Sequence, residues 1–177
     1  MSTSKEKELN LAFVDGQNLH LGTTQNGWKI DHRKFRIYLK DKYHVDEAYY
    51  FLGYVSEEQQ SLYKNLQKSG FIVLFKEHIS TLKGTKKGNV DTDIVFEIMK
   101  TIIERKDFSK ILLISGDGDY KKIVDYLMTK DLLKRMLFPN RQFASSLYRK
   151  MSPTYFDYLD TVGIRAKIEY SLKKRSP

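Results

Sequence analysis

Short apolar segments recur along this chain, with helix-like segments between them. LNLAFVD spans residues 9–15, FIVLF spans residues 71–75 and ILLIS spans residues 111–115. The aromatic-rich stretch at 48–54 and RMLF at 135–138 are also strand-like. Strands without a polar side must be buried on both faces, which is typical of a parallel sheet between helices. The sequence therefore predicts an α/β, three-layer domain with a central, mostly parallel β-sheet flanked by helices.

Amphipathic segments lie between these strands. Residues 31–43 are predicted to form a helix, with Asp31 as its N-cap and apolar side chains on one face. Ser56 and Gln59 have the spacing of a capping box, which predicts a helix that ends at Gly70. Two further helices are predicted to begin near Asp91 and near Tyr120.

The C-terminal part has a different pattern. Apolar and polar residues alternate over residues 162–172, which predicts one more strand with a solvated face, although a helix fits part of this stretch too. We expect residues 9–150 to form the main domain and residues 151–177 to form a helix-and-strand extension of it. Pairing of such a strand across a homodimer is left open.

Charge and composition exclude several classes of function. The chain has 31 Lys and Arg against 22 Asp and Glu, a net charge of +9, which favours a polyanionic partner such as nucleic acid. It has no Cys, which excludes disulfides, thiolate-bound zinc and a cysteine nucleophile. No apolar run reaches the roughly 20 residues that span a bilayer, and the N-terminus does not resemble a signal peptide. We therefore expect a cytoplasmic protein without a membrane partner.

Three acidic motifs stand where an α/β sheet places its active sites. VDGQN puts Asp15 directly after the first strand, and ISGDGDY puts Asp117 and Asp119 directly after the strand at 111–115. Asp91 opens the helix of GNVDTDIVFEI. Because ligands bind at the carboxyl ends of parallel strands, these side chains are expected to converge.

Converging carboxylates repel one another unless a cation is present. Hard divalent ions prefer oxygen ligands, so a cluster without His or Cys predicts a Mg²⁺ or Mn²⁺ site suited to phosphodiester chemistry. Each motif also has a simpler interpretation as a turn, a helix cap or a glycine-rich loop. It is their joint placement that favours a metal site.

These motifs, VDGQN, KGNVDTDI and SGDGDY, resemble those of the NYN domain family, in its LabA-like branch, in the same order and spacing over roughly residues 9–150. The resemblance implies a PIN-like fold and a metal-dependent ribonuclease. By position, the family's acidic residues are Asp15, Asp91, Asp117 and Asp119, which are the predicted catalytic residues and metal ligands. Asn18 matches the polar companion of Asp15.

Other positions match the family less closely. Asp93 and Glu97 are weaker candidate ligands on the same helix, and Glu97 stands where the family often has Asp. Near the C-terminus, Ser145 lies in a matching serine-containing stretch, whereas Pro153 and Thr154 replace the usual Ala-Asp pair.

Substrate contacts are predicted for several further residues. Lys83, Lys86 and Lys87 precede Asp91 in a basic, glycine-bounded loop and are predicted to bind a phosphate backbone, with a solvated surface as the alternative. The remaining predicted substrate-binding residues are Asn18, Ser115 and Trp28. Trp28, Tyr120 and Tyr148 fit either base stacking or the protein core.

The sequence therefore leaves three functions to be weighed. The first is an endonucleolytic, Mg²⁺- or Mn²⁺-dependent ribonuclease, with RNA, single strands included, as its partner. The second is a catalytically weak RNA-binding module of the same fold. The third is a phosphatase or nucleotide hydrolase, which the high positive charge and the lack of a phosphate-binding GxxxxGK[ST] loop disfavour.

Overall fold

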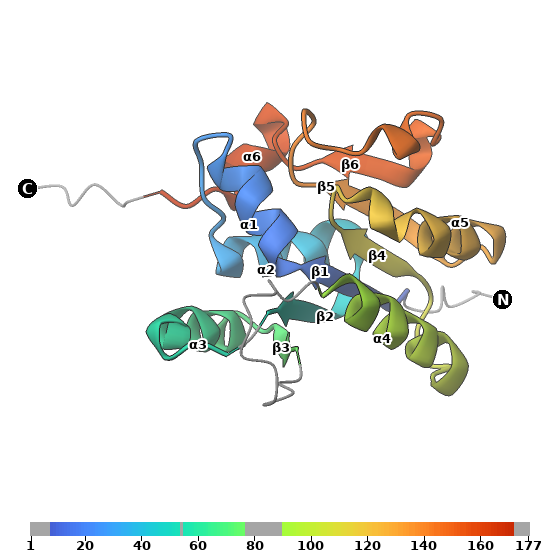
Figure 1. Ribbon diagram of the computed structural model, residues 1–177, viewed down its shortest axis with the longest axis horizontal. Coiled ribbons are helices and arrows are strands. Elements are labelled where there is room, and N and C mark those ends of the chain that lie inside the picture. Colours follow the sequence, from blue (N-terminus) through green and yellow to red (C-terminus); the bar gives the residue numbers. More distant parts are fainter. Residues whose placement is uncertain (1–7, 54, 77–89, 172–177) are drawn as a thin grey trace, which may run out of the picture.

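Six parallel strands form one sheet in the order β3-β2-β1-β4-β5-β6 (Figure 1). The computed structural model describes residues 8–53, 55–76 and 90–171. The strands are β1 (Asn10–Asp15), β2 (Val45–Leu52), β3 (Ile72–Phe75), β4 (Ile111–Ile114), β5 (Leu133–Phe138) and β6 (Phe156–Tyr158). Every neighbouring pair is parallel, so all carboxyl ends lie at one edge of the sheet. This confirms the predicted α/β architecture.

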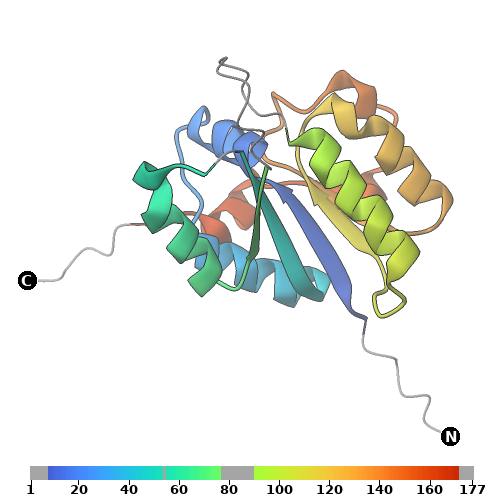
Figure 2. The same ribbon diagram turned by 60° about the horizontal axis from the view of Figure 1, so that its bottom comes forward.

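Helices cover both faces of this sheet (Figure 2). They are α1 (Gly16–Thr24), α2 (His32–Tyr43), α3 (Gln60–Lys68), α4 (Asp91–Glu104), α5 (Lys121–Thr129) and α6 (Val162–Ile168). Single 3₁₀ turns are η1 (Glu57–Gln59), η2 (Gly118–Tyr120), η3 (Ser146–Tyr148) and η4 (Pro153–Tyr155). Side chains of α1, α2, α3 and α6 pack into one core, and those of α4 and α5 into another.

The apolar strands contribute side chains to both cores. In β1, Ala12 and Val14 face the core under α2, whereas Leu11 and Phe13 face the core under α4. All four are at most 1% exposed. Because successive side chains of a strand point to opposite faces and helices cover both, none of these four positions reaches solvent. The first carboxylate of β1, Asp15, is accordingly its last residue.

The helix starts were predicted with mixed success. Asp31 caps α2 as expected, accepting a hydrogen bond from the Lys34 backbone N–H at 3.0 Å. The capping box at Ser56 is wrong, because the Ser56 side chain makes no capping hydrogen bond and a 3₁₀ turn precedes α3. Helix α1 was not predicted, although the Asp15 carboxylate caps it.

The predicted C-terminal strand is also wrong over most of its length. Val162–Ile168 is the helix α6, and only an isolated antiparallel bridge joins Glu169 to Ile30. The helix places Ile168 in the core and leaves Val162 88% exposed, which a strand facing the core would not do. Its Arg165 pairs with Glu169 one turn on, at 2.8 Å. Because apolar and polar residues alternate here, the sequence pattern did not reveal the helical spacing of Arg165 and Glu169.

No helix within the described ranges combines the length and the apolar character needed to cross a membrane.

Gly16 fixes the approach of α1 to β2 just after Asp15. A Cβ atom built on Gly16 would lie 2.4 Å from Tyr50 Cε1 and 2.6 Å from the Phe51 carbonyl oxygen. The backbone oxygen cannot move aside, so Gly16→Ala should lower the free energy of unfolding by about 1–3 kcal/mol in urea titrations. Gly163 has no heavy atom within 4 Å of its built Cβ, so Gly163→Ala should be neutral or stabilise by up to about 1 kcal/mol. Wild-type stability of Gly16→Ala would contradict the tight approach.

Candidate functional site

An acidic cleft of about 240 Å³ opens at the carboxyl edge of the sheet. Its carboxylates come from three elements: Asp15 ends β1, Asp91 begins α4 and Asp117 follows β4. β1 and β4 are adjacent in the sheet, so the first and third acidic motifs meet as predicted. Gln17 and Asn18 of α1 complete this side of the cleft.

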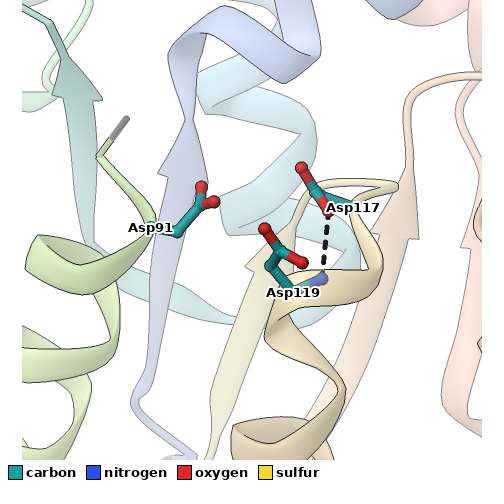
Figure 3. A group of neighbouring side chains, drawn as sticks. All are labelled: Asp91, Asp117 and Asp119. Carbon is teal, nitrogen blue, oxygen red and sulfur yellow. Dashed lines mark hydrogen bonds between the residues drawn. The ribbon is translucent and has the colours of Figure 1, made fainter. Parts of the chain in front are cut away.

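Three carboxylates, two of them in the wall of this cleft, point toward one another at this edge of the sheet (Figure 3). One oxygen from each of Asp91, Asp117 and Asp119 lies within 4.8 Å of the others. Asp91 and Asp117 are half-buried and Asp119 is exposed. The Asp119 backbone N–H donates to Asp117 Oδ1 at 3.0 Å, which fixes the turn between the two acids.

Asp15 lies deeper, with only 4% of its surface exposed. Its Oδ1 accepts a hydrogen bond from the Asn18 backbone N–H at 3.0 Å, as the N-cap of α1. Its Oδ2 accepts a hydrogen bond from the Tyr120 hydroxyl at 3.0 Å. The Ser115 hydroxyl lies 3.5 Å from the same oxygen. The carboxylate is therefore held by three elements of the fold.

The Tyr120 hydroxyl joins Asp15 to the outer carboxylates. It also donates to Asp91 Oδ1, at 2.7 Å. A hydroxyl has one hydrogen to donate, so it fully satisfies only one of the two carboxylates at a time. Tyr120 itself is fully buried, which excludes the base-stacking role considered for it from the sequence.

Backbone contacts fix the loop that carries Asp117. The Gly116 N–H donates to Asn18 Oδ1 at 2.8 Å, and the Asp117 N–H donates to Ser115 Oγ at 3.1 Å. Ser115 is fully buried, so it positions the acids and does not reach a substrate, which corrects its predicted role. Asn18 is half-buried and lines the cleft, where its side chain connects α1 to the loop after β4.

Burial or neighbouring negative charge raises the pKa of two carboxylates of the site, Asp15 and Asp119. Burial raises the pKa of Asp15, and the negative charges of Asp91 and Asp117 raise it further, against the hydrogen bonds from Asn18 and Tyr120. The charge of Asp117, followed by that of Asp91, raises the pKa of the exposed Asp119. Burial also raises the pKa of Tyr120, so its hydroxyl remains a donor.

The donors present fit a hard divalent cation. Asp91, Asp117 and Asp119 offer only carboxylate oxygens, the ligands that Mg²⁺ and Mn²⁺ prefer. Their mutual spacing is small enough for one ion to contact all three. A cation there would also relieve the repulsion that raises the pKa of Asp119.

The two weaker candidates lie outside this group. Asp93 and Glu97 are on α4, but neither belongs to the group of carboxylates that the described residues bring together. Two residues along a helix is a rotation of about 200°, so Asp93 cannot share the face of Asp91. One oxygen of Asp93 is buried, and no hydrogen-bond partner for it lies among the described residues.

Two sets of predicted substrate contacts have different outcomes. Trp28 is only 3% exposed and packs in the core, with the Arg165 guanidinium 5.4 Å from its ring centre, so its predicted substrate contact is wrong. Lys83, Lys86 and Lys87 lie outside the described residues.

Other residues support the site without having been assigned to it. The Tyr148 hydroxyl donates to the Asp117 carbonyl oxygen at 2.7 Å, and Tyr148 is 4% exposed. The Ser145 N–H donates to the Gly116 carbonyl oxygen at 2.9 Å. A Cβ atom at Gly118 would lie 2.6 Å from Ser145 Oγ, so the absence of a side chain at Gly118 lets Ser145 pack against this turn. The serine-containing stretch was the only sequence signal for this support.

Comparisons with known proteins agree with this fold. The NYN domain family matches residues 11–159. The Low amplitude and bright protein LabA of Synechococcus elongatus is 26% identical over 166 residues, which is 89% of this chain and 86% of that protein. A crystal structure of a protein of unknown function from Vibrio parahaemolyticus has the same fold, with a TM-score of 0.75 and 21% identity over 96% of this chain and all of that one.

The raised pKa of Asp15 makes a prediction about stability. Above the pKa of the unfolded state, about 3.9, the folded protein holds this proton more tightly, so folding is progressively disfavoured as the pH rises. Asp15→Asn removes that penalty and keeps the shape of the side chain. The free energy of unfolding is measured by urea titration at pH 4 and at pH 7, without divalent ions. The value for Asp15→Asn minus that for wild type should be larger at pH 7 than at pH 4.

Asp131→Asn is the matched control for this measurement. Asp131 is exposed, pairs with Lys110 at the opposite edge of the sheet, and has a positive φ of 54° that Asn tolerates. Its stability relative to wild type should change by no more than about 0.5 kcal/mol. An Asp15→Asn difference that is the same at both pH values would contradict a strained, buried carboxylate.

Proposed function

The chain belongs to the NYN domain family, whose members share the PIN-like nuclease fold, and we propose that it is a divalent-metal-dependent endoribonuclease. One observation carries the proposal: Asp91, Asp117 and Asp119 converge at the carboxyl edge of the sheet, with Asp15 buried directly behind them. Phosphodiester hydrolysis at such a site needs a cation, and these are the ligands that hold Mg²⁺ or Mn²⁺.

The proposed roles follow from the contacts of each side chain. Asp91, Asp117 and Asp119 would hold the ion. When bound, such an ion supplies charge stabilisation to the phosphate and lowers the pKa of water. Asp15, predicted from the sequence as a further ligand, is not in this group of three, and it fixes the inner wall of the cleft through Asn18 and Tyr120.

Tyr120 and Ser115 keep the acids in place without meeting the substrate. The Tyr120 hydroxyl contacts both Asp15 and Asp91, and so links the end of β1 to the start of α4. Ser115 connects Asp15 to the backbone of the Asp117 loop. Preorganisation of this kind is what allows a site to stabilise charge in the transition state without rearranging.

The charge of the chain favours a polymer over a small phosphate ester. A net charge of +9 attracts a polyanion over a long range, with an affinity that falls with salt. We propose Lys83, Lys86 and Lys87 as part of the backbone-binding surface because they precede Asp91 directly in the sequence. The alternative function, a catalytically weak RNA-binding module of the same fold, differs from this proposal only in lacking cleavage.

Cleavage of labelled RNA tests the proposal. Wild type should cut single-stranded RNA in Mn²⁺ or Mg²⁺ and be inactive with a chelator. Asp117→Asn removes one negative ligand but can still accept the Asp119 N–H, so the fold should remain. Substitution of residues behind a metal ligand costs about 10–100-fold, so loss of the ligand itself should cost at least about 100-fold in rate. Asp15→Asn should likewise abolish cleavage and retain most RNA binding.

Asp131→Asn serves again as the control and should cleave at the wild-type rate. A filter-binding titration on the same preparations separates cleavage from binding. Equal rates of product release by wild type, Asp117→Asn and Asp15→Asn would show that the acidic cleft is not the site of cleavage. RNA binding by all of them with no cation-dependent cleavage would establish the binding module instead.

A further inference from the structure

A second cavity lies beside the acidic cleft and plays no part in holding its carboxylates. Its volume is about 420 Å³, and it is bounded by α1, the start of α2, the end of β2 and the start of α3. Gln17, an exposed residue of α1, lines both this cavity and the acidic cleft. Gly16, which follows Asp15 directly, lies in its wall. A ligand in the cavity would therefore adjoin whatever occupies the cleft.

The walls of this cavity combine apolar surface with a few polar groups. Leu19, Ile30 and Leu62 line it together with the buried Tyr50. This composition, at this volume, is typical of pockets for small organic molecules, which are mostly apolar with a few polar groups that fix orientation. It differs from the neighbouring cleft, whose lining includes three carboxylates.

The polar groups of the cavity are basic or neutral. His20, His32, Lys29 and Gln59 line it, and no carboxylate does so among the described residues. The His32 ring lies edge-on to Tyr50, with ring centres 5.7 Å apart and planes at 82°. Neither nitrogen of His32 has a hydrogen-bond partner within the described ranges. Burial lowers the pKa of His32, which favours the neutral ring with one donor and one acceptor.

We propose that this cavity binds the base of a nucleotide next to the scissile phosphate of the RNA. The inference rests on the proposed function. A nucleobase has the required chemistry, an aromatic face for the apolar walls and a polar edge for His32 and Gln59. Bases of single strands turn outward into such pockets, whereas paired bases of a duplex are stacked and cannot enter.

A third cavity lies on the opposite side of the acidic cleft. A smaller cavity of about 160 Å³ shares Asn18 and Leu21 with the acidic cleft and is lined by Phe143, which is 58% exposed. Three hollows thus adjoin one another across α1, with the carboxylates in the middle one. A single strand that crosses α1 would place its phosphate at the acids and successive nucleotides on either side.

Two variants test the base pocket. His32→Ala removes the unpaired imidazole, and Gln59→Trp places a large ring at an exposed residue of the cavity wall. Gln67→Trp is the matched control, on an exposed residue of α3 that does not line the cavity. The measured quantity is kcat/KM in Mn²⁺ for single-stranded RNA, divided by that for bis(p-nitrophenyl) phosphate, a phosphodiester without a base.

Loss of a stacked base typically weakens binding by about 5- to 150-fold, so both pocket variants should lower this ratio about tenfold or more. Gln67→Trp should leave the ratio unchanged, and wild type should cut single-stranded RNA faster than duplex RNA of the same sequence. An unchanged ratio in both pocket variants, or equal cleavage of duplex, would overturn the inference while the nuclease itself stands.

A binding measurement decides the question if no cleavage is found. Wild type without divalent ions is titrated with adenosine and cytidine monophosphates and followed by amide NMR spectra. Shifts at Gln17, Lys29 and His32 that Gln59→Trp suppresses would support the base pocket although the proposed nuclease had failed. Saturating nucleotide without shifts at these amides would overturn it.

Discussion

The hydroxyl of Tyr120 lies between the carboxylates of the first and second acidic motifs, Asp15 and Asp91, and the site depends on this contact. Asp15 is the last residue of β1 and directly follows four buried apolar residues, so it is buried where the strand ends. Asp91 begins a helix on the other face of the sheet. The Tyr120 hydroxyl lies within hydrogen-bond distance of both, at 3.0 and 2.7 Å. Its single hydrogen holds the acids together but cannot neutralise them, which leaves a cleft suited to a cation.

The topology explains why acids from three motifs that are far apart in sequence meet. All six described strands are parallel, so the residues that follow β1 and β4 emerge at the same edge. The turn at Gly118 then brings Asp119 back toward Asp91, and the Ser145 segment packs against this turn. Elements outside the acidic motifs therefore determine how closely the carboxylates approach.

Much of this could be predicted from the sequence, because apolar strands and the acids that follow them are local patterns. Periodicity predicted the sheet, and cap preference predicted Asp31. The ends of two strands and the start of one helix predicted the convergence of Asp15, Asp91, Asp117 and Asp119. The burial of Trp28 could not be predicted, since it packs in a core built from several elements, and the Arg165 side chain over its ring comes from α6, more than 130 residues later. Helix α6 itself was misassigned because its residues alternate in polarity while Ile164 and Ile168 are also spaced for a helix face. The role of Tyr120 depends on side-chain direction, which spacing does not determine.

Anomalous diffraction from a crystal grown or soaked in Mn²⁺ tests the central claim most directly, since it locates the ion without any assay of activity. The account predicts a strong anomalous peak within bonding distance of carboxylate oxygens of Asp91, Asp117 and Asp119, at about 2.0–2.2 Å for a small hard cation, and its loss in Asp117→Asn. A fully occupied Mn²⁺ peak elsewhere on the protein, with these three carboxylates uncoordinated, would contradict it.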